Sequence, residues 1–173
     1  NISKELCLSL GADDIYLFEF KTDKDNNTQF HDIASYHSDP NQDDLPISRS
    51  ILNRVHAEGR PILTSDAALD DRFSASASIV MKKIRSVLAV PLIFMNKPIG
   101  AIYAVNNRRA EQFKSEDLEL ATTVGMLVGN ALEMWESMEK QSKVYRNVLK
   151  TIAAISEVNT PEQRGESERI ANF

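Results

Sequence analysis

The sequence predicts an α+β fold: an antiparallel sheet of about five or six strands with helices on its faces, followed by one long C-terminal helix. The sheet is predicted by two pairs of neighbouring segments, rich in β-branched and aromatic residues, that are each joined by a polar turn. The helix is predicted because no proline lies between Ser115 and Asn159 and apolar residues recur there at helical spacing. With 173 residues, 42% of them hydrophobic, the chain can bury a substantial core.

The N-terminal part predicts a short helix and a hairpin. The helix is marked by apolar residues four positions apart, namely Ile2, Leu6 and Leu10. Gly11 ends it, because glycine readily adopts the left-handed conformation that closes a helix. Residues 14–20 predict a strand and residues 30–37 its return strand, with the polar residues 21–29 as the loop between them.

The middle of the chain predicts a second helix, which begins at Ser48 as its cap and ends near Gly59. The face it buries is marked by Ile47, Ile51 and Val55. Residues 61–64 predict a short strand. The following residues 65–76 have no regular period, as is typical of binding loops, and a short helix is expected over 76–84.

Two strong strands follow, over residues 86–95 and 98–105, with a tight turn at Asn96 and Lys97. The first of them is almost continuously apolar, as expected of a central strand that is buried on both faces. Pro91 lies inside it and has no N–H to donate, so we expect a bulge or a lost ladder bond at this point.

The long helix begins at Ser115 and carries apolar positions at alternating spacings of three and four. These positions are Ala121, Val124, Val128, Ala131, Trp135, Met138, Ser142, Tyr145, Leu149 and Ile152. The pattern is typical of a coiled-coil seam. At about 1.5 Å per residue the helix is on the order of 60 Å long, well beyond the edge of a small domain. We expect the part up to about Leu132 to pack within its own domain.

The remainder of this helix is expected to pair with a second copy, a free helix or an antiparallel pair being the alternatives. The predicted dimer seam consists of Trp135, Met138, Ser142, Tyr145, Leu149 and Ile152. Ser142 is polar at a core position, so we expect a soft spot there that lets the pair adopt two arrangements.

Composition excludes several classes of function. The net charge of −5 and the pI near 5.3 argue against a nucleic-acid surface, which needs clustered Lys and Arg. Cys7 is the only cysteine, which suits a reducing compartment. No apolar stretch approaches 18 residues, so we expect a cytoplasmic chain without membrane insertion. Because the chain begins at Asn1 without a Met, we expect it to be a piece of a longer protein.

Several short motifs occur in a fixed order along the chain. They are Ser48–Leu52, Gly59–Asp66, Asp70–Phe73, Ser76–Ile79, Ile84–Leu92 and Ile99–Tyr103. On these motifs the run 46–107 resembles a GAF domain, the small-molecule-sensing and dimerisation module of signalling proteins, and the likeness extends over roughly the first 135 residues. The resemblance implies a pocket on one face of the sheet, roofed by residues 65–84.

The residues expected to bind a ligand there are Asp66, Phe73, Ser74, Ser76, Ser78 and Arg85. Phe73 and the serine hydroxyls offer a stacking surface and hydrogen-bond donors. Arg85 opens a buried strand and therefore needs an anionic partner, either Asp66 or a carboxylate or phosphate of a ligand.

GAF domains that bind cyclic nucleotides carry an Asn-Lys-Phe-Asp-Glu signature, and this chain offers a degenerate version of it. The matching residues are Asn107, Arg108, Phe113 and Asp117, while Leu118 stands where the final Glu would be. The resemblance implies an ion pair between Arg108 and Asp117 and leaves a small-molecule or cyclic-nucleotide ligand open. The three histidines have no metal-ligand spacing.

The C-terminal residues Gly165–Phe173 resemble the opening of an HD-GYP domain, the metal-dependent cyclic di-GMP phosphodiesterase module. Glu162 and Glu166 are possible partial metal ligands, but no complete metal site is present. We therefore predict a GAF-like domain over 1–134, a coiled-coil linker over 135–158 and the start of an output domain over 159–173.

The predicted function is a non-enzymatic module that senses a small molecule, forms a homodimer and signals through its helix to that output domain. The alternatives are a dimerisation scaffold without a ligand and the sensor of a histidine kinase or nucleotide cyclase.

Overall fold

The structure is a computed structural model, and it describes residues 2–25, 27–39, 47–67, 70–73 and 84–158, with side chains as far as residue 152. Contacts group the chain into two units, Asn1–Ala131 and Leu132–Phe173. Within the described ranges, none of the helices combines the length and the apolar composition that a membrane span needs.

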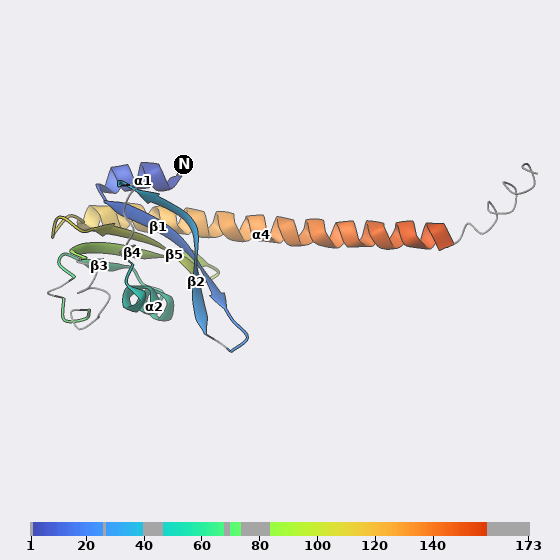
Figure 1. The fold of residues 1–173 in the computed structure, drawn as a ribbon, viewed down its shortest axis with the longest axis horizontal. Helices are drawn as coiled ribbons and strands as arrows, with labels where there is room; N and C mark the ends of the chain where they lie inside the picture. Colours follow the sequence, from blue (N-terminus) through green and yellow to red (C-terminus); the bar gives the residue numbers. More distant parts are fainter. Residues whose placement is uncertain (1, 26, 40–46, 68–69, 74–83, 159–173) are drawn as a thin grey trace, which may run out of the picture. The chain divides into compact units, whose positions relative to one another are not determined.

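The first unit contains one antiparallel sheet, and the predicted fold class is confirmed (Figure 1). The described strands run in the order β2-β1-β5-β4-β3, and every neighbouring pair is antiparallel. Their bounds are β1 Asp14–Thr22, β2 Thr28–His37, β3 Ile62–Thr64, β4 Ser86–Phe94 and β5 Lys97–Asn106. The helices are α1 Ile2–Leu10, α2 Arg49–Glu58 and α4 Ser115–Val158.

Helices cover both faces of the sheet (Figure 1). The main core lies between α2 and the sheet. It is formed by Tyr16, Phe18, Ile51, Leu52, Val55, Ile62, Ala67, Phe73, Ile84, Val87, Ala89, Ala101, Tyr103 and Val105. The buried hydroxyl of Tyr103 accepts a hydrogen bond from the Ser48 N–H over 3.2 Å and so ties the start of α2 to β5. On the opposite face, α1 and the first part of α4 cover side chains that alternate with those of the main core.

The ends of the helices follow the sequence prediction with two corrections. Gly11 and Gly59 both adopt left-handed backbone conformations and end α1 and α2 as expected. Ser48 holds the N-cap position of α2, but its hydroxyl makes no capping bond and lies 2.9 Å from the Ser50 hydroxyl. In α1 the predicted apolar residue Ile2 is exposed, whereas Ser3 is buried.

The β4–β5 hairpin turns one residue earlier than predicted. Phe94 pairs with Lys97, and the two turn residues Met95 and Asn96 have φ angles of 46° and 65°. Two successive positive φ angles are the geometry of a tight hairpin turn. The register shifts between Leu92 and Ile93, where Ile99 of β5 is left without a pair. The bulge expected at Pro91 thus lies one residue further on, and Pro91 itself remains opposite Ala101.

The first part of α4 packs on the backbone of β4. A Cβ added at Gly125 would stand 3.0 Å from the Pro91 carbonyl oxygen, and one at Gly129 would stand 2.9 Å from that of Ile93. These two glycines lie four residues apart and therefore on one face of the helix. They let α4 approach the sheet more closely than a helix with side chains at these positions could.

Candidate functional site

Asp66 and Arg85 form the ion pair that the sequence offered as one of two alternatives. The Arg85 Nη2 lies 3.0 Å from the Asp66 Oδ2. Asp66 follows β3 and Arg85 precedes β4, and the pairing of these strands brings the two residues together. The backbone closes the same junction, since the Ala67 N–H donates to the Arg85 carbonyl over 2.7 Å. Arg85 therefore has its anionic partner, Asp66, within the protein.

Phe73 was predicted to be a pocket wall, and it is a buried member of the main core. The Arg54 and Arg72 guanidinium carbons lie 5.7 Å and 5.2 Å from the centre of its ring. At these distances both arginines make cation–π contacts with the ring, which stabilise its position. Ser74, Ser76 and Ser78, the other predicted wall residues, lie outside the described residues.

A second ion pair, which the sequence did not indicate, lies next to the first. Asp70 and Arg72 form a bidentate ion pair, with Arg72 Nη2 2.6 Å from one carboxylate oxygen and Nε 2.9 Å from the other. The hydrogen bond from Arg72 lowers the pKa of the Asp70 carboxyl to about 2. Arg72 also donates to the Leu63 carbonyl over 3.1 Å, which fixes the loop to β3.

These two pairs border a shallow polar hollow at the end of β3. Its lining consists of Leu63, Thr64, Ser65, Asp66, Asp70 and Arg72. Both carboxylates in this lining are paired with an arginine, so the hollow carries little net charge. Such a surface can offer hydrogen bonds to a small polar molecule.

The degenerate cyclic-nucleotide signature has a structural role, and one expected contact is wrong. Arg108 does not pair with Asp117: its Nε lies 3.9 Å from an Asp13 oxygen. Asp117 instead accepts the Lys114 N–H over 2.8 Å at the start of α4. This contact satisfies one of the free N–H groups of the first helical turn. Phe113 is buried.

The fourth signature residue, Asn107, is held by two neighbouring carboxylates. Its N–H donates to Asp13 over 3.0 Å, and its side-chain amide lies 3.4 Å from an oxygen of the buried Asp14. Asp14 also lies 3.2 Å from His37 Nδ1. The same His37 nitrogen lies 3.4 Å from the Tyr16 hydroxyl. The cluster joins the ends of β1, β2 and β5 and holds the loop that leads into α4.

Neither metal nor thiol chemistry finds support in the described part of the chain. No group of three or more His, Cys, Asp or Glu residues comes together there in a way that could hold a metal ion. Glu162 and Glu166 lie outside the described residues. Cys7 is buried, and burial raises the pKa of its thiol to about 11, which disfavours a reactive thiolate.

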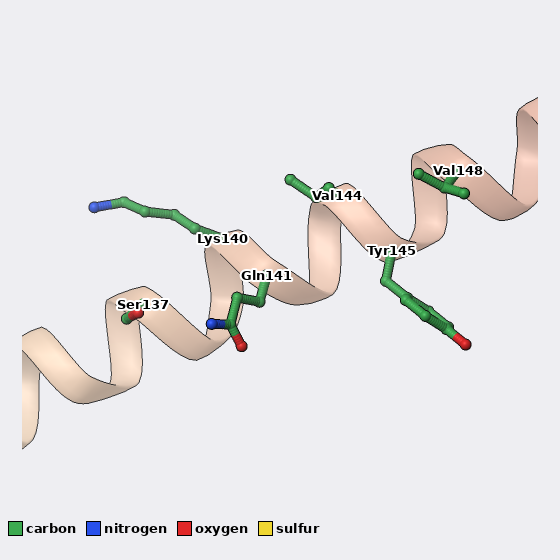
Figure 2. A pocket seen from close by; sticks show the side chains of 6 residues that line it. All are labelled: Ser137, Lys140, Gln141, Val144, Tyr145 and Val148. Atoms are coloured by element: carbon green, nitrogen blue, oxygen red, sulfur yellow. The ribbon is translucent and has the colours of Figure 1, made fainter.

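In the second unit, α4 exposes apolar side chains as far as side chains are described. All six predicted seam residues are exposed, and Trp135 and Met138 are 65% and 62% accessible to solvent. Two successive hollows lie along this surface, and one is lined by Ser137, Lys140, Gln141, Val144, Tyr145 and Val148 (Figure 2). In water, a row of large exposed apolar side chains is a sign of an interaction surface.

The fold is an α+β domain with helices on both faces of an antiparallel sheet and a long last helix. The family model for the GAF domain matches residues 1–132, and the chain belongs to the GAF family. GAF domains are in general regulatory and not catalytic. No curated protein sequence matches the chain.

Solved structures with this fold come from several kinds of protein. A GAF domain from Synechocystis sp. in its photoproduct state has a TM-score of 0.62 and 16% identity, over 80% of this chain and 92% of that one. The GAF domain/HD domain protein of Geobacter sulfurreducens has a TM-score of 0.59 and 14% identity, over 78% and 89%. A type II free methionine-R-sulfoxide reductase from Thermoplasma acidophilum has a TM-score of 0.56 and 12% identity, over 75% and 85%. At these identities the likeness concerns the fold alone.

Proposed function

We propose that this chain is a regulatory GAF module that forms a homodimer through the second half of α4 and passes a signal along this helix to an output domain. The observation that carries the proposal is the row of exposed apolar side chains on α4. A single helix this long and this exposed gains little stability by itself, because helices in proteins are stabilised mainly by the packing of an apolar face. A second copy supplies an identical face and is the simplest partner.

Sedimentation equilibrium on the whole chain tests this proposal. We expect a dimer in the micromolar range and a monomer for Met138→Glu, because a buried carboxylate without a partner is strongly disfavoured. The matched control is Lys143→Gln, which changes an exposed residue on the charged side of the same helix and should leave the dimer intact. A wild-type chain that stays monomeric up to 100 µM would overturn the proposal.

Small-molecule sensing is a second candidate function, favoured by the polar hollow at the end of β3. Most of its hydrogen-bonding groups come from the loop after β3, and loops are where binding residues are commonly found. A thermal-shift screen with cyclic nucleotides and small carboxylic acids tests it, because a ligand that binds only the folded state raises the melting temperature. The shift should disappear in Arg72→Gln and persist in the control Arg60→Gln. If none of these compounds shifts the melting temperature, the scaffold role without a ligand is favoured.

For the output domain we propose a metal-dependent cyclic di-GMP phosphodiesterase, on the resemblance of Gly165–Phe173 to the start of an HD-GYP domain. A histidine kinase and a nucleotide cyclase are the alternatives. Hydrolysis of cyclic di-GMP by the protein that carries this segment tests the choice, and kinase or cyclase activity in its place would reject it.

For the 173-residue chain itself we propose no catalytic role. Reduction of a sulfoxide by a thiol requires a reactive thiolate, and the only cysteine of the chain, Cys7, is buried with a raised pKa. We expect the purified chain not to reduce methionine sulfoxide, and measurable reduction would contradict a purely regulatory role.

A further inference from the structure

The charged residues of α4 between Leu132 and Ile152 all lie on one side of the helix. They are Glu133, Glu136, Glu139, Lys140, Lys143, Arg146 and Lys150. At about 100° per residue they fall within an arc of roughly 140°, which leaves the opposite side free of charge. Two pairs among them are bonded along the helix itself, Lys140 to Glu136 over 2.9 Å and Lys143 to Glu139 over 3.4 Å. These four charges therefore do not need a partner helix, and the uncharged side remains for one.

Two seams with heptad spacing fit on this uncharged side, and they share Met138, Tyr145 and Ile152. The first adds Trp135, Ser142 and Leu149, which are the residues expected from the sequence alone. The second adds Met134, Gln141 and Val148, each one position earlier. The two seams differ in which column of residues lies at the centre of the uncharged arc. On a helical projection this centre lies nearer to the second seam.

The hollows along the helix favour the second seam as well. Gln141, Val144, Tyr145 and Val148 line one hollow, and their spacing of three, one and three residues is that of a hole that accepts a side chain from a partner helix. Figure 2 shows Gln141 and Tyr145 projecting from one side of the helix, and Val144 and Val148 from another. The next hollow is lined by Val144, Asn147, Val148, Thr151 and Ile152, and its Val148, Thr151 and Ile152 stand seven residues after Gln141, Val144 and Tyr145. Ser142 and Leu149 line neither hollow.

The first unit provides independent support in the same heptad numbering. Leu120 and Leu127 continue the column of Met134 at intervals of seven residues, and they are 44% and 67% exposed. Ala121 continues the column of Trp135 and is 0% exposed, because it packs within its own unit. The column of Trp135 is thus used inside the domain, whereas the column of Met134 is available to a partner.

From these observations we infer that two copies pair in parallel and in register through the second seam, with Gln141 as its single polar layer; this inference rests on the proposed homodimer. In a parallel pair each layer contains the same residue from both helices, so Gln141 faces Gln141 of the partner subunit. The amide of one can then donate to the carbonyl of the other. In an antiparallel pair the layers combine different seam positions, and Gln141 would face an apolar or aromatic neighbour instead.

The uncharged side of α4 carries large apolar side chains that a partner would cover. Met134, Met138 and Tyr145 are each more than 60% exposed, and Val144, Val148 and Leu149 are at least half exposed. A partner helix would remove these side chains from water, which is the main driving force for such a pair.

Single cysteine substitutions in the whole chain, on a Cys7→Ala background, test the register and the orientation together. Under mild oxidation we expect Gln141→Cys and Val148→Cys to form disulfide-linked dimers at least ten times faster than Ser142→Cys, Leu149→Cys and the control Lys143→Cys. Only positions at the centre of a parallel seam bring identical Cβ atoms to disulfide distance.

The contrary outcomes are distinct. Faster linkage at 142 and 149 would overturn the register and leave the homodimer standing. A dimer in which no single variant links to itself would overturn the parallel orientation. A chain that sediments as a monomer would reject the proposed homodimer itself.

Discussion

Gly129 of α4 lies directly on the backbone of Ile93 in β4. A Cβ at position 129 would stand 2.9 Å from the Ile93 carbonyl oxygen and 3.1 Å from its nitrogen. Backbone atoms of a paired strand cannot move aside as the end of a flexible side chain can. This contact therefore sets how closely α4, the helix that leaves the domain, lies on the sheet.

Gly129→Ala is expected to destabilise the domain, although alanine is the better helix former. Overpacking is expected to outweigh a gain in helix propensity of roughly 1 kcal/mol and to leave a net loss of about 1 kcal/mol. Urea unfolding at a fixed protein concentration measures the change. Asn130→Ala, at the exposed neighbouring position, is the control and should be neutral or stabilising. Equal stability of Gly129→Ala and wild type would show that the helix is free to shift.

The Asp70–Arg72 pair should make part of the stability depend on pH. The pKa of Asp70 is lowered to about 2 in the folded state, so its contribution is complete above the unfolded pKa of about 4 and is lost as the pH falls towards 2. Because Arg72 is partly exposed, we expect Asp70→Asn to cost only about 1 kcal/mol at pH 7. The difference from wild type should shrink between pH 4 and pH 2 in urea unfolding. The exposed neighbour Asp71 provides the control Asp71→Asn, and the same pH profile in both variants would contradict the assignment.

Asn106 is expected to be a structural residue of the β5–α4 loop. Its buried side-chain oxygen accepts the Arg108 N–H over 3.0 Å and the Arg109 N–H over 2.7 Å. Asn106→Ala removes both bonds and should lower the free energy of unfolding by about 1–3 kcal/mol. Thermal unfolding checks this, with Asn53→Ala on the exposed side of α2 as a control that should change little. A wild-type melting temperature for Asn106→Ala would show that the loop is held in another way.

Gln141→Leu is expected to tighten the dimer and to loosen its register. Replacement of a polar seam residue by leucine adds apolar burial and removes the preference for one alignment. The dissociation constant should fall by about tenfold, as about 1.4 kcal/mol implies. Ser142→Leu, at the flank of the seam, should change it less. A larger effect of Ser142→Leu would return Ser142 to the seam as the soft spot expected from the sequence.

Most of the fold could be predicted from the sequence because its elements carry local signals. Alternation of apolar residues, the glycines at helix ends and the absence of proline in α4 all act within a few residues. The Asp66–Arg85 pair was among the alternatives because an arginine that opens a buried strand needs an anionic partner. The pairing of β3 with β4 brings the two residues together.

The contacts that were missed depend on distant parts of the chain. Arg108 pairs with Asp13 because β1 and β5 are neighbours, although the two residues lie far apart in sequence. The resemblance to the cyclic-nucleotide signature suggested Asp117, which is nearer in sequence. The role of Gly125 and Gly129 also appears only when β4 lies beneath α4, because in sequence they are merely weak helix formers.

The molar mass of the whole chain in solution tests the central claim most directly. Light scattering after size exclusion, at concentrations from 1 to 100 µM, should give a mass of two chains of 19.4 kDa each at the upper end. Met138→Glu should give the mass of one chain at every concentration, with its circular dichroism showing a folded sheet domain. A wild-type mass of one chain throughout would contradict pairing through α4, and so would an unchanged dimer in Met138→Glu.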